Sequence, residues 1–141
     1  MYKKISFLLL VLIGLSACNK DKTAGCGMVA CTSEYVFAYY GIVFNNANGQ
    51  PVDVKNVSAI NLRTHKQVAL PPTPPTVDFV AGFYLVASNE NKQEFSTGGD
   101  DIEITATSVT TNQTKMATIN ISGGCNCSVI KKSGPDKLIF D

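Results

Sequence analysis

The sequence contains no tryptophan, one histidine and few charged residues, which make up 16% of the chain. Its 12 basic and 11 acidic residues nearly balance, and no cluster of Lys and Arg marks a surface for nucleic acid or for anionic lipid headgroups. We therefore expect no nucleic-acid partner. Beyond the N-terminal region no segment shows a sustained helical period of apolar residues, so the expected fold class is all-β.

The longest apolar run, residues 5–15, is too short to span a bilayer, which needs about 20 apolar residues. Two lysines precede the run, and the small residues Ser16 and Ala17 connect it to Cys18. A positive start, a short apolar stretch and small residues are typical of a secretory signal peptide. We expect residues 1–17 to form this signal.

The end of the signal, Leu15-Ser16-Ala17-Cys18, resembles the bacterial lipobox. In that motif the cysteine is diacylated on sulfur with fatty acids such as palmitate, becomes the mature N-terminus, and is usually acylated on its amine. The resemblance implies lipidation at Cys18, and more than one acyl chain makes a durable membrane anchor. Asn19 replaces the aspartate that retains some lipoproteins at the inner membrane. We expect a lipid-anchored protein of the outer membrane, with its periplasmic or surface-exposed face left open.

Removal of the signal lowers the basic count from 12 to 10 and leaves a nearly neutral mature chain of about 124 residues, enough for one domain. Residues 18–25 are small and polar, as in a flexible tether that begins at the lipidated Cys18. Residues 26–141 form the expected domain. The lipid on Cys18 is then its expected attachment to the membrane.

Four further cysteines lie near the ends of this domain, Cys26 and Cys31 at its start and Cys125 and Cys127 close to its end. An even number in an oxidising envelope predicts two disulfides. In a strand, Cys125 and Cys127 would point to the same face and would be strained as a pair. Each is therefore expected to bond Cys26 or Cys31, in either order, and to stabilise the fold by about 4 kcal/mol. A zinc site is the less favoured alternative, because the spacing departs from Cys-x2-Cys.

Alternating apolar residues and turn signals predict seven or eight short strands. The expected strands are residues 34–45, 52–64, 66–70, 79–88, 101–110, 115–122 and 137–140. The turn Asn48-Gly49 predicts a hairpin between the first two strands, and the proline-rich residues 71–75 predict an extended loop or, alternatively, a polyproline ligand. We expect a single antiparallel β-sandwich, Ig-like or transthyretin-like, closed by two disulfides.

Residues 40–52 resemble the opening hairpin of carboxypeptidase-regulatory-like β-sandwich modules, in which an Asn-rich turn is followed by Gly-x-Pro-Val. With its cysteines at both ends, the chain as a whole resembles small surface lipoproteins of Gram-negative bacteria that carry this type of sandwich. The resemblance implies a fold and an anchor, and it transfers no activity.

Few residues suggest chemistry. His65 lies in a predicted turn with no evident nucleophile, and Asp100, Asp101 and Glu103 match no calcium-loop spacing. We expect no cofactor and no metal. The favoured function is a non-catalytic binding or scaffolding module of the cell envelope that contacts a protein or glycan through its loops. The alternative is an enzyme, or an accessory subunit of one, acting on envelope or extracellular polymers through an unrecognised site.

Overall fold

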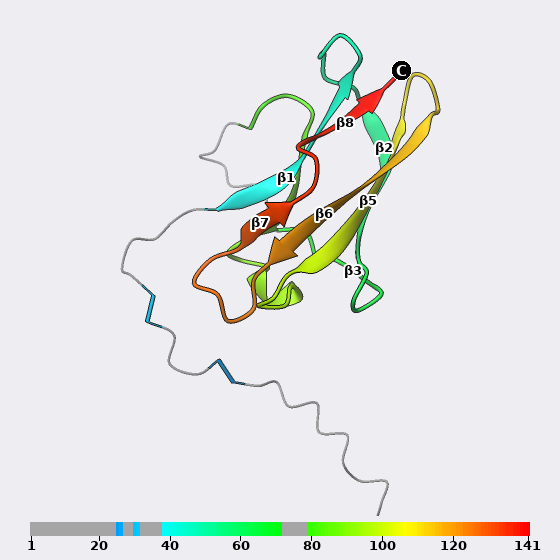
Figure 1. The fold of residues 1–141 in the computed structure, drawn as a ribbon. Coiled ribbons are helices and arrows are strands. Elements are labelled where there is room, and N and C mark those ends of the chain that lie inside the picture. Colours follow the sequence, from blue (N-terminus) through cyan, green and yellow to red (C-terminus); the bar gives the residue numbers. More distant parts are fainter. Residues whose placement is uncertain (1–24, 27–29, 32–37, 72–78) are drawn as a thin grey trace, which may run out of the picture.

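The computed structural model describes residues 25–26, 30–31, 38–71 and 79–141 (Figure 1). The expected signal peptide, Cys18 and residues 19–24 of the expected tether lie outside the described residues. So do residues 34–37 of the first predicted strand and residues 72–75 of the proline-rich loop. Within the described ranges, no helix has the length and apolar character needed to cross a membrane.

The described residues form two β-sheets and one short 3-10 helix, η1 (Lys92–Glu94). The first sheet has the order β4-β1-β8 and contains β1 (Tyr39–Asn46), β4 (Phe83–Ser88) and β8 (Lys137–Phe140). The second has the order β3-β2-β5-β6-β7 and contains β2 (Val54–Asn61), β3 (Lys66–Gln67), β5 (Asp100–Ser108), β6 (Thr114–Ser122) and β7 (Ile130–Ser133). The prediction of an all-β fold class is confirmed for this part of the chain.

The predicted hairpin between the first two strands is wrong. A tight turn does follow β1, but only one bridge, between Asn45 and Pro51, continues the pairing. Pro51 has no backbone N–H with which to extend a ladder. The chain then crosses to the second sheet, where Val54 lies opposite Ser108 of β5. The prediction of purely antiparallel pairing is also wrong, because β1 and β8 run parallel.

One hydrophobic cluster draws on both sheets. Phe44 of β1 and Val86 of β4 belong to the same buried cluster as Ile102 and Ile104 of β5 and Ile119 of β6. Burial alternates along β5, since successive side chains of a strand point to opposite faces. The polar loop after β4 adds Phe95 to this cluster, with 2% of its surface exposed.

The prediction of two disulfides is confirmed, and the structure fixes their order as Cys26–Cys125 and Cys31–Cys127. Their Cα atoms are 5.2 and 5.5 Å apart. Cys125 and Cys127 lie in the loop between β6 and β7 and not on a strand, so the strand argument against their mutual pairing does not apply. Both N-terminal cysteines therefore meet a single loop, here called the cysteine loop (residues 123–129).

Candidate functional site

The strands of the second sheet connect two ends of the molecule that differ in content (Figure 1). The cysteine end contains the cysteine loop, η1 and the turn between β2 and β3. The opposite end contains the β1–β2 loop, the β5–β6 turn and the end of β8, and we call it the pocket end after the cavity that these segments line. β6 has nine residues between these ends, which corresponds to about 30 Å of extended strand.

The cysteine loop is held against the segment that contains η1. The N–H of Gly124 donates to the Lys92 carbonyl over 2.7 Å, and the N–H of Cys125 donates to the Thr97 hydroxyl over 3.2 Å. The Asn126 amide donates to the Thr97 carbonyl, and the Lys92 ammonium donates to the Asn126 carbonyl, both over 3.1 Å. These hydrogen bonds hold the cysteine loop against the η1 segment, and both disulfides attach to this loop.

A buried carboxylate, Asp100, connects two further segments at the cysteine end, the end of β2 with the turn that follows it and the loop after η1. The Arg63 guanidinium donates to both of its oxygens, over 2.7 and 2.9 Å. The Asn61 amide and the Ser96 N–H donate over 2.7 and 2.9 Å. Burial raises the pKa of the Asp100 carboxyl, but the hydrogen bonds from Arg63, Ser96 and Asn61 outweigh it and hold that pKa well below its usual range. Protein donors thus occupy this carboxylate.

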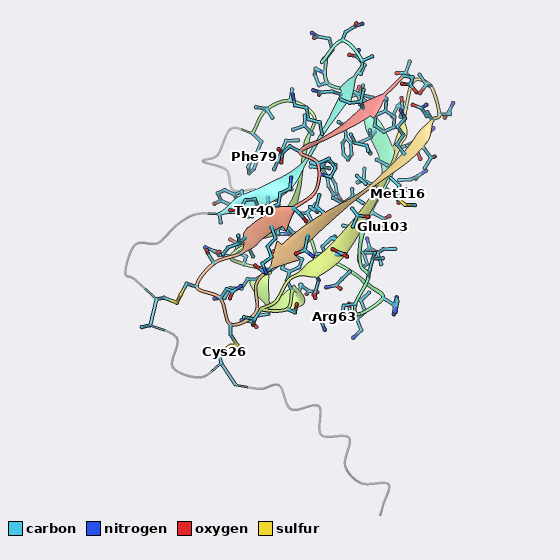
Figure 2. All side chains as sticks on the ribbon, in the orientation of Figure 1. Cys26, Tyr40, Arg63, Phe79, Glu103 and Met116 are labelled. Atoms are coloured by element: carbon cyan, nitrogen blue, oxygen red, sulfur yellow. A yellow bond between two sulfur atoms is a disulfide. The ribbon has the colours of Figure 1, made fainter. Side chains whose placement is uncertain are left out.

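The other residues singled out for chemistry lie apart from one another. His65 sits exposed in the β2–β3 turn with a φ of 56°, and its N–H donates to the Asn61 carbonyl over 2.8 Å. Asp101 is exposed and accepts a hydrogen bond from the Asn120 amide over 2.7 Å, while Glu103 lies at mid-strand on β5 (Figure 2). Among the described residues, no group of three or more His, Cys, Asp or Glu side chains is placed to hold a metal ion.

A concave site lies at the pocket end and has a volume of about 390 Å³. This volume falls within the range of about 300 to 1,000 Å³ that is typical of small-molecule sites. Three segments that are distant in the sequence line it: residues 46–48 and 51–53, residues 108 and 110–111, and residues 140–141. The pocket therefore opens where the ends of the two sheets meet.

The β1–β2 loop is fixed by its own side-chain and backbone hydrogen bonds. The Asn46 carboxamide oxygen accepts from the N–H groups of Asn48 and Gln50, over 3.0 and 2.9 Å. Gly49 adopts a φ of 78°, a conformation that glycine reaches without strain. Farther along, the Asp53 carbonyl accepts from the Val109 N–H over 2.9 Å, which ties this loop to the β5–β6 turn.

The other two walls are fixed in the same way. The Ser108 hydroxyl accepts from the Thr111 N–H over 3.2 Å within the β5–β6 turn. The Asp141 carboxylate accepts from the Gln113 amide over 2.9 Å and from the Lys115 ammonium over 3.1 Å. These two side chains, Gln113 first, lower the pKa of the Asp141 carboxyl. The pocket walls are therefore largely preformed.

The lining combines an apolar floor with a rim of hydrogen-bonding groups. Phe140 is 1% exposed and, with Pro51 and Val52, supplies the apolar part. Asp53 and Asp141, together with nearby hydroxyls and amides, supply acceptors and donors. Sequence reasoning missed this site, because its Asn- and Thr-rich segments look like ordinary turns until the fold brings them together.

The histidine singled out from the sequence does not belong to the pocket. The two carboxylates of the pocket end stand at an open rim, and the one histidine of the chain lies at the cysteine end, beyond the far ends of β2 and β5. Comparisons of the chain with protein-family models, with curated proteins and with solved structures find no match.

Proposed function

We propose that this protein is a lipid-anchored, non-catalytic binding or scaffolding module of the bacterial cell envelope. In this proposal Cys18 carries the lipid, the outer membrane holds the protein, and the pocket end contacts a protein or glycan partner. The observation that carries the proposal is the placement of the disulfides and the pocket at opposite ends of the same sheet.

The short chain between Cys18 and Cys26 limits how far the cysteine end can lie from a lipid on Cys18. Seven residues separate the two cysteines, so their Cα atoms are eight steps apart and can lie at most about 29 Å from each other. Cys26 is bonded to the cysteine loop, so a lipid on Cys18 would keep the cysteine end close to the membrane. The pocket end would then project away by about the length of β6, roughly 30 Å.

The fold type belongs to the proposal as well. We infer that the two sheets pack face to face as a β-sandwich of Ig-like or transthyretin-like kind. A single buried cluster with members from both sheets supports this inference. Loops at one end of such a sandwich commonly carry the binding function.

Lipidation is tested by a Cys18→Ser substitution in the full chain, with Asn19→Ser as the neighbouring control. We expect wild type and the control to incorporate labelled palmitate and to fractionate with the outer membrane. Cys18→Ser should lose the label and leave the membrane fraction. A Cys18→Ser protein that stays in the membrane would refute the anchor.

Binding through the pocket end is tested by photo-crosslinking in cells. A photoreactive amino acid at Asn48 of the β1–β2 loop is compared with one at Glu90, an exposed position at the cysteine end. We expect a defined adduct from Asn48 and none of the same composition from Glu90. An adduct formed equally from both positions, or from Glu90 alone, would contradict the proposed orientation.

A further inference from the structure

We infer that the pocket at the pocket end binds a neutral saccharide. This inference rests on the proposed function and specifies its ligand class. It follows from the charge of the pocket rim, from the chemistry of the floor and from the rigidity of the walls.

The charged groups at the rim balance one another, which favours a neutral ligand. Asp53 and Asp141 both line the pocket, and Lys115 lies 3.1 Å from the Asp141 carboxylate. No described side chain donates to the Asp53 carboxylate, so its acceptor capacity is open to a ligand. The nearby Lys55 ammonium is engaged with the Asn112 side chain over 2.7 Å. The Asn112 amide is neutral, so Lys55 keeps its positive charge, and Lys55 and Lys115 together balance the charges of Asp53 and Asp141. The rim therefore offers neither an anionic nor a cationic ligand a net opposite charge.

The floor and rim together match a pyranose. A sugar ring presents C–H groups on one face and hydroxyls around its edge, and it needs an apolar surface beside hydrogen-bond acceptors. Pro51 and Val52 offer that surface, and the Asp53 carboxylate can accept hydrogen bonds from two hydroxyls at once. Hydroxyls of Thr110 and Thr111 add both donors and acceptors.

The other ligand classes fit less well. A metal ion would need more ligands than the two carboxylates of the pocket, and one of them, Asp141, already pairs with Lys115. A wholly apolar ligand would desolvate the Asp53 carboxylate, to which no described side chain donates, and this is costly. A neutral polyhydroxylated ligand satisfies the acceptors and covers the floor.

Wall rigidity favours affinity for such a small ligand. The Asn46 side chain fixes the β1–β2 loop, Gln113 and Lys115 fix Asp141, and the Asp53 carbonyl is tied to Val109. Groups that are already ordered lose little conformational entropy when a ligand binds.

The experiment probes the full chain, purified in detergent, on an array of gluco-, manno- and galacto-configured neutral oligosaccharides. Uronic-acid and amino-sugar oligosaccharides on the same array serve as anionic and cationic comparators. We expect binding to at least one neutral series and none to the uronic acids. Titration calorimetry with the strongest neutral oligosaccharide then measures the variants.

Asp53→Asn should weaken this binding by about tenfold or more, because a charged acceptor is lost. Ala47→Trp, which fills the pocket from the exposed β1–β2 loop, should abolish it. Glu90→Gln removes an equally exposed carboxylate from the cysteine end and should bind as wild type does. All variants should keep the wild-type unfolding midpoint, since the altered side chains are exposed.

Absence of neutral-sugar binding, binding to amino sugars or uronic acids alone, or equal effects of Asp53→Asn and Glu90→Gln would overturn the inference. These outcomes are distinct from failure of the proposed function. An Asn48 adduct together with membrane anchoring through Cys18 would remain even if no saccharide bound.

Discussion

At the scale of single residues, Asp100 shows how the cysteine end is stabilised. Its carboxylate is 1% exposed and accepts hydrogen bonds from Arg63, Asn61 and Ser96. Arg63 itself is half exposed, so the ion pair alone contributes modestly. The buried Asn61 amide and the partly buried Ser96 N–H make the carboxylate important, because each would lose its acceptor if Asp100 were replaced.

We expect Asp100→Asn to lower the free energy of unfolding by about 2 to 3 kcal/mol at pH 7, since an amide nitrogen would face donors. The pKa of Asp100 is lowered on folding from its ordinary 3.8, so its contribution is present above that value and is lost as pH falls. The difference between wild type and variant should therefore shrink below about pH 5. Urea unfolding at pH 7 and pH 3 measures it.

Asp101→Asn is the matched control, as an exposed carboxylate on the next residue, and should change stability by less than about 0.5 kcal/mol at either pH. A constant difference between wild type and Asp100→Asn across this pH range would contradict the assignment of the lowered pKa to Asp100.

Gly123 tests how closely the cysteine loop approaches η1. A Cβ at this position would lie 2.3 Å from the Lys92 carbonyl oxygen, whereas a Cβ at Gly98 would meet nothing within 4 Å. We expect Gly123→Ala to destabilise the protein by about 1 to 3 kcal/mol, because backbone must move. Gly98→Ala should be neutral or slightly stabilising. Thermal unfolding compares the pair, and equal midpoints would argue against the close approach.

At the scale of elements, the two disulfides act on the same pair of segments. They span 99 and 96 residues, but once one is closed, the other adds a loop of only a few residues. The expectation of about 4 kcal/mol from each bridge independently therefore does not hold. In the chain-entropy model the first closure contributes about 5 kcal/mol and the second about 2 to 3 kcal/mol.

Removal of either disulfide by a Cys-to-Ser pair should thus cost about 2 to 3 kcal/mol, and removal of both about 7 kcal/mol. Denaturant unfolding of Cys26→Ser/Cys125→Ser, of Cys31→Ser/Cys127→Ser and of the fourfold variant measures these values. Additive losses, with the fourfold cost equal to the sum of the two pairs, would show that the bridges act independently.

Sequence patterns predicted strands better than their partners. The alternation of apolar residues in the sequence predicted the ends of β5 and β6 to within about two residues, and β8 begins and ends where it was expected. Alternation indicates which face of a sheet a residue occupies, but it does not indicate which strand lies beside it. The prediction of a β1–β2 hairpin was therefore wrong. The Arg63–Asp100 pair and the pocket join residues that are far apart in the sequence, and no local pattern signals such contacts.

At the scale of the whole molecule, the two ends of the protein carry different features. The cysteine loop at one end is bonded to the segment that follows Cys18, and the pocket lies about one strand length away at the other end. A membrane anchor on Cys18 would orient these two ends relative to the membrane. It would hold the cysteine end at the lipid surface and leave the pocket accessible to a ligand in solution.

The most direct test is energy transfer to a headgroup dye in vesicles that carry the full lipidated chain. A fluorescent amino acid is placed at Asn48 of the pocket end or at Glu90 of the cysteine end; Glu90 lies beside the cysteine loop through the hydrogen bond from the Val129 N–H to Asn89. The account predicts weaker transfer from Asn48, with a mean distance to the membrane greater by about 30 Å, the length of β6. Equal transfer from the two positions, or stronger transfer from Asn48, would contradict it.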